Sequence, residues 1–221
     1  MIRVYAFKWV PPFAQGLVRD LRVRWALEEA GQPYEEMLIG FGADQASAEY
    51  RELQPFGQVP AYEEDGLALF ESGAIVLRIA ARSEALMPHD GAARAKAMQW
   101  VFAAINSIEP HVQQIAFILG FYKDEEWAKL RRPSALEIAE RRLDQLAERL
   151  GDKPFLEEGG FTVGDLMMTS VLRIGATCGL LDRRPTLSAY VARCESRPAF
   201  QKALADQLRP FAEHAPPAAA A

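Results

Sequence analysis

Residues 53–77 read LQPFGQVPAYEEDGLALFESGAIVL, and this stretch decides the fold. Asp65-Gly66 is a typical hairpin turn, because both residue types adopt the backbone angles that a tight turn requires. It joins two short runs, Val59–Glu63 and Leu67–Phe70, which we predict to be antiparallel strands. Loop residues precede this hairpin and a helix start follows it, so the stretch predicts a loop, a β-hairpin and a helix in that order.

Pro60 lies inside the first predicted strand. Proline has no N–H group to donate to a sheet, so it belongs at an edge or at the beginning of a strand. One interpretation is an ordinary trans proline, since only about 5–6% of X-Pro bonds are cis. The other is a cis Val59-Pro60 bond that leaves the N–H and C=O groups of Val59 free to pair with an extended peptide ligand.

Ser72 opens the predicted helix over residues 72–82 and is a typical N-cap residue. A capping box would place Glu or Gln three residues later, but Ile75 occupies that position. The N-terminus of a helix carries free N–H groups and a partial positive charge, which bind carboxylates. The sequence therefore allows either plain capping by Ser72 or capture of a ligand carboxylate at this helix.

The rest of the first half alternates between strand and helix. Strands are predicted at residues 2–7 and 34–39, and helices at residues 17–30 and 44–53. Together with the opening stretch, these give the order βαβαββα. This order predicts a thioredoxin-like α/β domain over residues 1–82, with parallel strands joined through helices and an antiparallel hairpin at the end.

Strand patterns disappear after a predicted linker at residues 83–91, so residues 92–208 are expected to form an all-helical domain, a helical bundle. Thr162 and Asp165 have the spacing of a capping box, with Asp in place of Glu, before an apolar helix. Residues 209–221 end in an alanine- and proline-rich run and are predicted to be a disordered tail. The predicted helices cover residues 92–121, with a bend at Pro110, and residues 133–150, 163–178, 186–194 and 198–208.

Composition excludes several function classes. The 221-residue chain has a net charge of −5 with both signs interspersed, whereas nucleic-acid binding needs a basic face. No signal-peptide pattern and no long apolar run is present, so we expect a cytoplasmic protein without membrane spans. The two cysteines, Cys178 and Cys194, lack metal or redox spacing, and the histidines are scattered, so no metal site is expected.

Gln58-Val59-Pro60 followed by Glu71-Ser72 resembles the glutathione site of the cytosolic glutathione transferases. In that family, the strand with the cis proline pairs with the cysteinyl part of glutathione. The resemblance implies that Val59 has this role and that Glu71 and Ser72 bind the γ-glutamyl amine and carboxylate. It places Gln58 near the glycyl end and implies glutathione as the co-substrate.

The second half resembles the helical domain of the same transferases. FTVGD at residues 161–165, preceded by Gly160, is similar to their helix-opening motif, and RPAF at residues 197–200 is similar to their C-terminal helix. The resemblance covers residues 1–208. It implies a detoxifying enzyme that activates the glutathione thiol as a thiolate for attack on small apolar electrophiles, and it implies a homodimer.

The group that activates the thiol is not fixed by the sequence. The family usually places Tyr, Ser or Cys after the first strand, but no Ser, Thr or Cys precedes Ser47. Tyr5 is the only hydroxyl in the first 33 residues and is one candidate, although its strand position also suits a core residue. Arg19 is the second candidate, because a guanidinium stabilises a thiolate by charge and hydrogen bonding. The remaining candidates are Lys8, Trp9, Gln15 and the N–H groups of Gly16 and Leu17.

Alternative interpretations accompany these candidates. Arg19, Arg22 and Arg24 also fit a solvent-exposed basic run. Trp9 and Phe13 are candidates for the wall of an electrophile pocket or for plain surface packing. A further group, in the middle of a predicted helix, lines that pocket or forms an exposed polar face: Asn106, Glu109 and His111.

Two other functions fit the same motifs. The first is another glutathione-dependent enzyme, such as a mixed-disulfide reductase, isomerase, dehalogenase or peroxidase. The absence of a cysteine near the predicted thiol site argues against reduction by an enzyme thiol. The second is a non-enzymatic binding module of the same fold, although such a module would not need the Val59-Pro60 and Glu71-Ser72 motifs.

Overall fold

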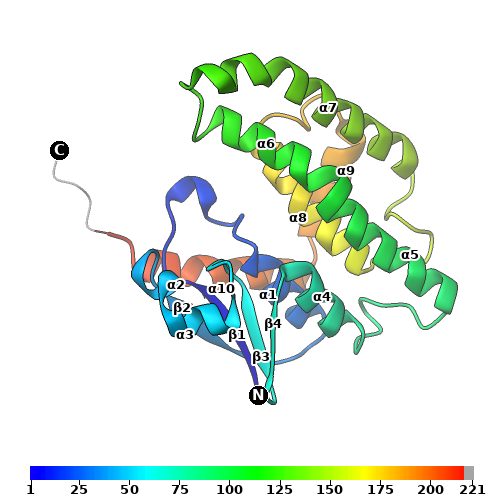
Figure 1. The fold of residues 1–221 in the computed structure, drawn as a ribbon. Helices are drawn as coiled ribbons and strands as arrows, with labels where there is room; N and C mark the ends of the chain where they lie inside the picture. Colours follow the sequence, from blue (N-terminus) through cyan, green and yellow to red (C-terminus); the bar gives the residue numbers. More distant parts are fainter. Residues whose placement is uncertain (217–221) are drawn as a thin grey trace. The chain divides into compact units, whose positions relative to one another are not determined.

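A four-stranded mixed sheet forms the centre of the first of two units in the computed structural model, which describes residues 1–216 (Figure 1). The strands lie in the order β2-β1-β3-β4, with β1 parallel to β2 and antiparallel to β3. Their bounds are Ile2–Phe7 for β1, Tyr34–Ile39 for β2, Ala61–Glu64 for β3 and Leu67–Phe70 for β4. The predicted thioredoxin-like α/β fold is therefore confirmed.

Most residues of the central strands β1 and β3 are buried, whereas the edge strands β2 and β4 are partly buried or exposed. Val4 and Ala6 face one way, while Tyr5 and Phe7 face the other and pack with Tyr50 and Val59. The helices before the linker are α1 (Asp20–Glu29), α2 (Ala43–Ala46), α3 (Ala48–Leu53) and α4 (Ser72–Ala80), and a 3₁₀ turn covers Pro12–Ala14.

Several boundaries in this unit differ from the prediction. The strand expected at Val59–Glu63 covers Ala61–Glu64, because Pro60 cannot donate to the sheet, and the helix expected at residues 72–82 ends at Ala80. The helix expected at residues 17–30 begins only at Asp20, because the 3₁₀ turn and the turns after it occupy the preceding residues. The helix expected at residues 44–53 is broken at Ser47, whose hydroxyl accepts a hydrogen bond from the Tyr50 N–H at 3.2 Å and starts a new helix.

The last helix, α10 (Pro198–Glu213), belongs to the first unit and not to the helical domain in which it was expected. It packs along α1, where the Phe200 and Trp25 rings meet with their centroids 4.9 Å apart. It also extends past residue 208, because Phe211 is buried among Phe7, Val10 and other core residues. The predicted tail is thus helical over residues 209–213, and residues 217–221 of that tail lie outside the described residues.

The second unit, residues 84–197, is all-helical, as predicted. The helix expected at residues 92–121 is interrupted before Pro110 by a π-helical segment, Ala103–Ile108. Pro110 has no N–H to donate, and the wider π turn accommodates this loss, so the predicted bend is confirmed. The helices of this unit are α5 (Gly91–Phe102), α6 (Glu109–Leu119), α7 (Glu126–Leu150), α8 (Val163–Thr177) and α9 (Pro185–Glu195).

Asp165 organises the core of the second unit. The predicted capping box is present, with the Asp165 carboxylate accepting from the Thr162 N–H at 2.9 Å. The same carboxylate accepts from the Leu156 N–H at 2.9 Å and from the Tyr190 hydroxyl at 3.0 Å. It is fully buried, so these donors replace the water that a carboxylate would otherwise bind.

Replacing Asp165 by alanine should destabilise the protein by about 2–4 kcal/mol, because four buried donors, including the Thr162 hydroxyl, lose their acceptor. Chemical denaturation followed by circular dichroism measures this change. Asp182→Ala is the control, since Asp182 is exposed on a turn of the same unit. A loss for Asp165→Ala no larger than that of the control would contradict the role assigned to this carboxylate.

Candidate functional site

The Val59-Pro60 peptide bond is cis, so the cis bond of the second interpretation is confirmed. Sheet pairing begins one residue later, where Ala61 lies opposite Phe70. Among the described residues, the N–H and C=O groups of Val59 have no hydrogen-bond partner, although its side chain is buried. This residue therefore offers one donor and one acceptor, the pair that a peptide ligand uses to add itself to a strand.

The loop before Val59 is held by side-chain hydrogen bonds to its carbonyl groups. The Tyr50 hydroxyl donates to the Gln58 carbonyl at 2.6 Å, and the Gln45 amide donates to the Gly57 carbonyl. Gly57 has a φ of +61°, which suits glycine at this turn. The Gln58 side chain is exposed beside the Val59 backbone, so it can reach a ligand that lies on this strand.

Register brings a helix N-terminus to the same place. Because Ala61 pairs with Phe70, the residues before Ala61 lie opposite Glu71 and Ser72, which follow Phe70. Glu71 is the N-cap residue of α4 and has a φ of +70°, an unusual angle for a side chain other than glycine. The prediction that Ser72 is the N-cap is therefore wrong by one residue, since Glu71 makes the turn and Ser72 is the first helical residue.

The Ser72 hydroxyl has a specific partner. It accepts a hydrogen bond from the Arg22 guanidinium at 3.2 Å, which joins the first turns of α1 and α4. The first N–H groups of α4 have no acceptor inside the helix, and the fully buried Ile75 cannot supply one. Serine hydroxyl, helix N-terminus and nearby guanidinium together form a binding place for a carboxylate.

Two arginines of the basic run, Arg22 and Arg24, are buried and not solvent-exposed, whereas Arg19 is partly buried. Arg24 is completely buried and pairs with Asp20 at 2.8 Å and with Glu36. Burial raises the pKa of the Asp20 carboxyl, while the Arg24 charge opposes this shift. Sequence reasoning missed Arg22 as a site residue, although its place one helical turn after Arg19 was a usable signal.

The loop between β1 and α1 uses several of its predicted thiol-binding groups internally. The Gln15 amide donates to the Val10 carbonyl at 3.1 Å, and the Leu17 N–H donates to the Ala14 carbonyl at 3.0 Å. Trp9 is partly buried against the apolar cluster around Val59, whereas Lys8 is exposed. Arg19, the N-cap residue of α1, is a second cation of this region and lies on the same helical side as Arg22.

Tyr5 points its hydroxyl along β3 in the direction away from Val59. The hydroxyl donates to the Glu63 carboxylate at 2.5 Å, and Glu63 follows Ala61, the residue opposite Tyr5. Burial, and then the Glu63 carboxylate, raise the pKa of Tyr5 to about 12. The phenol is thus held as a neutral donor to Glu63.

The predicted polar group of the second unit does not form one exposed face. Asn106 is exposed on the π-helical segment, whereas Glu109 is buried at the start of α6. Burial, and then the charges of three arginines on α7, lower the pKa of His111. Over residues 1–216, no helix is long and apolar enough to cross a membrane, and no group of acidic, His or Cys side chains could hold a metal ion.

Known proteins carry the same sequence signals. Residues 15–81 match the family model of the glutathione S-transferase N-terminal domain, and residues 95–198 match that of the C-terminal domain. Glutathione S-transferase 1 of Zea mays is 33% identical over 201 residues, which is 83% of this chain and 90% of that protein. The glutathione S-transferase of Hyoscyamus muticus is 29% identical over 198 residues, with 83% and 92% covered.

Solved structures agree with these matches. A glutathione transferase family member from Pseudomonas fluorescens, with two glutathione bound, superposes with a TM-score of 0.80 at 28% identity over 92% of each chain. A glutathione transferase from Pseudomonas putida, with one glutathione disulfide bound per subunit, gives 0.79 at 26% identity over 92% of this chain and 90% of that one.

The fold defines a two-unit protein in which a thioredoxin-like unit places the cis Val59-Pro60 bond opposite the N-terminus of α4. The chain belongs to the glutathione transferase family, because the two family models together match most of its length.

Tyr5 should stay protonated throughout the neutral range, because its phenol is partly buried and donates to Glu63. We expect the absorbance difference at 295 nm between the native protein and Tyr5→Phe to be flat up to about pH 10. The same titration in denaturant is the control, since the unfolded chain should show one tyrosine fewer in the variant. A midpoint for Tyr5 below pH 10 would contradict this geometry.

Proposed function

We propose that this protein is a glutathione transferase that binds glutathione along Val59 and activates its thiol. The observation that carries this proposal is the cis Val59-Pro60 bond, with the unpaired Val59 backbone opposite the N-terminus of α4. A strand end and a helix end that meet in this way fit a short peptide with a carboxylate at one end.

The residues around this strand supply the contacts of the tripeptide. The Val59 N–H and C=O groups pair with the cysteinyl residue, and the first turn of α4 with Ser72 holds the γ-glutamyl carboxylate. The exposed Glu71 carboxylate binds the γ-glutamyl amine, while Gln58 binds near the glycyl end. Arg22 holds the Ser72 hydroxyl in place for this contact.

Arg19 is the stronger of the two candidates for thiol activation. The Tyr5 hydroxyl donates its hydrogen bond to the Glu63 carboxylate. Arg19 lies on the side of α1 from which Arg22 reaches Ser72. Lowering a thiol pKa from about 8.5 to about 6.5 takes roughly 2.7 kcal/mol. One hydrogen bond from a guanidinium together with the N-terminus of α1 supplies an effect of this size.

Replacing Ser72 by alanine should weaken glutathione binding by about tenfold to hundredfold, since a hydrogen bond to a charged group contributes about 1.5–3 kcal/mol. Isothermal titration calorimetry with glutathione measures this affinity. Ser83→Ala, just beyond the C-terminal end of α4, is the matched control and should bind like the wild type. Equal affinity for the two variants would rule out this site.

Thiol activation is tested by the absorbance of bound glutathione thiolate as a function of pH. The wild type should show a thiol pKa well below the value of about 8.5 for a free thiol. Arg19→Met should raise that pKa and reduce the conjugation rate below pH 7 by about tenfold or more, whereas Tyr5→Phe should leave both within about twofold. A larger rise in the thiol pKa and a larger loss of rate for Tyr5→Phe than for Arg19→Met would make Tyr5 the activating residue.

A second candidate function is the reduction of glutathionyl mixed disulfides by bound glutathione. The Pseudomonas putida glutathione transferase holds a glutathione disulfide, and this observation favours disulfide reduction as a second candidate. Cys178 and Cys194 both lie in the second unit, and burial raises the pKa of each, so the thiolate in this reaction would come from glutathione. A panel of electrophiles and glutathionyl disulfides distinguishes the two activities.

Further properties belong to the same proposal. We infer a cytoplasmic detoxification enzyme that acts on small apolar electrophiles as a homodimer. The exposed Phe102 on α5 is available for an interface between copies, while most of the Trp100 surface is buried within the second unit. Sedimentation equilibrium of the wild type and Phe102→Asp tests the dimer.

A further inference from the structure

Gln207 on α10 holds the backbone on both sides of Arg19. Its amide nitrogen donates to the Val18 carbonyl at 3.1 Å and to the Asp20 carboxylate at 2.7 Å. An amide NH₂ group has two hydrogens, so these two bonds use all of its donor capacity. The side chain is completely buried, and its carbonyl oxygen has no partner among the described residues, so the two donated bonds orient the amide.

The residue between the two acceptors is the proposed thiol-activating group. Val18 and Asp20 are the neighbours of Arg19, and Asp20 is the first residue of α1. The Asp20 carboxylate is held from its other side by Arg24 at 2.8 Å. Gln207 therefore fixes the place where the loop becomes a helix, and the direction in which Arg19 leaves the backbone depends on that place.

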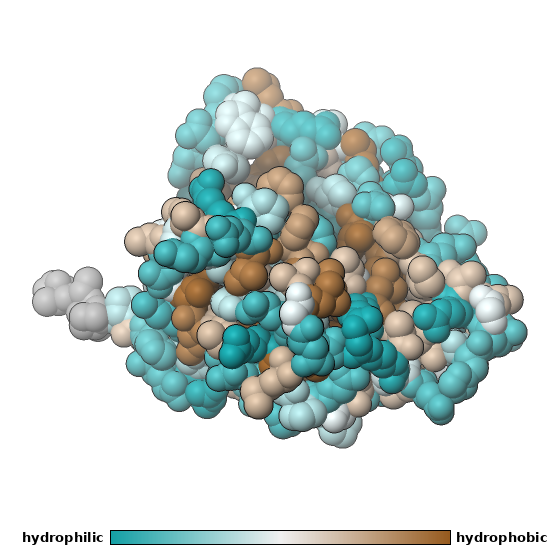
Figure 2. Space-filling model, turned by 60° about the horizontal axis from the view of Figure 1, so that its bottom comes forward, coloured by the Kyte–Doolittle hydropathy of each residue, from teal (hydrophilic) through white to brown (hydrophobic). Residues whose placement is uncertain are grey.

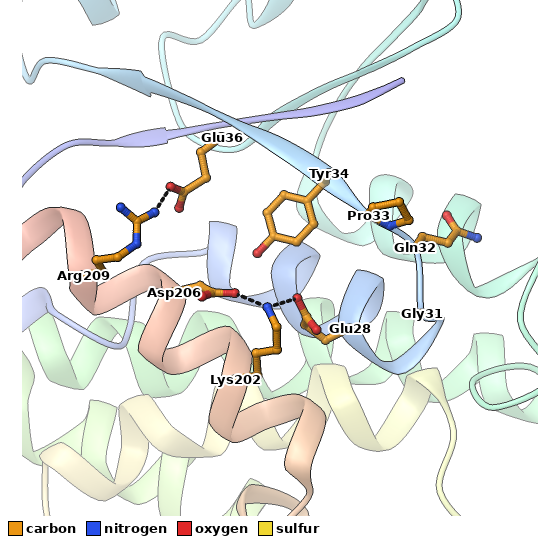
Figure 3. A pocket seen from close by; sticks show the side chains of 9 residues that line it. All are labelled: Glu28, Gly31, Gln32, Pro33, Tyr34, Glu36, Lys202, Asp206 and Arg209. Carbon is orange, nitrogen blue, oxygen red and sulfur yellow. Dashed lines mark hydrogen bonds and ion pairs between the residues drawn. The ribbon is translucent and has the colours of Figure 1, made fainter.

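The helix that carries Gln207 is itself firmly attached to the first unit. Figure 3 shows Lys202 between Asp206 and Glu28, and Arg209 beside Glu36. These ion pairs are partly exposed, and the Lys202 pair attaches α10 near the C-terminal end of α1, far along the helix from Arg19. Gln207 and Lys202 therefore both attach α10 to α1, Gln207 near the N-terminal end of α1 and Lys202 near its C-terminal end.

We propose that Gln207 is a positioning residue for thiol activation, acting through the Val18 and Asp20 groups that flank Arg19. This inference rests on the proposed function. It adds that the C-terminal helix, which contacts no glutathione group named above, controls the chemistry of the thiol. A merely structural Gln207 would lower stability without changing the ionisation of a bound thiol.

The test compares Gln207→Met with Lys202→Met in the full-length protein. Methionine matches the length of glutamine and removes both donors, so Val18 and Asp20 lose their shared partner. We expect Gln207→Met to raise the pKa of bound glutathione by about one unit and to lower kcat below pH 7 by about tenfold, because small displacements of a reacting group have large effects on rate. The glutathione dissociation constant should stay within about threefold, and Lys202→Met should change none of these values.

The outcomes distinguish the proposed function from the proposed role of Gln207. A wild type that binds glutathione without a lowered thiol pKa would overturn the proposed function itself. A normal wild type with equal thiol pKa values in both variants would overturn only the role of Gln207. If Gln207→Met does not fold, Gln207→Asn keeps a polar amide but is one methylene shorter, and the same shift is expected. Failure of both variants to fold would make Gln207 a folding determinant and overturn its role in thiol chemistry.

Discussion

The pairing of Ala61 with Phe70 is the constraint on which the site depends. It fixes how far the β3–β4 ladder extends, and so it places Val59 and Pro60 opposite Glu71 and Ser72. A shift of this register by one residue would turn every side chain of the hairpin to the other face of the sheet. The buried faces of β3 prevent such a shift, because Ala61 and Tyr62 are packed on opposite sides.

The second feature on which the site depends is that the charges buried at the start of α1 pair with one another. Asp20 is completely buried but receives hydrogen bonds from Arg24 and Gln207, and Arg24 pairs with two carboxylates. A buried ion pair adds little net stability compared with apolar packing, but it is costly to break. Such an arrangement favours one position of the α1 N-terminus, which a binding site for a small peptide requires.

Much of this was predictable from sequence because it depends on local signals. The Asp65-Gly66 turn and the Thr162–Asp165 spacing each limit the backbone within a few residues, and they predicted the hairpin and the capped helix. Pro60 left two interpretations open, of which the cis bond is present. Three features depended on tertiary contacts and were not predictable: the hydrogen bond from Arg22 to Ser72, the hydrogen bond from Tyr5 to Glu63, and the return of α10 to the first unit. In each, the partners are more than 45 residues apart, so periodicity carries no information about them.

The return of α10 has a consequence for how the protein is made. The first unit consists of two pieces of chain, and the whole second unit, residues 84–197, is inserted between them. On a ribosome that adds about 5–20 residues per second, the sheet therefore waits roughly 6–23 s for the helix that completes its core. During that interval the apolar places for Phe200 and Phe211 stay uncovered. The turn at Arg19 therefore acquires its partner Gln207 only after the whole second unit has been synthesised.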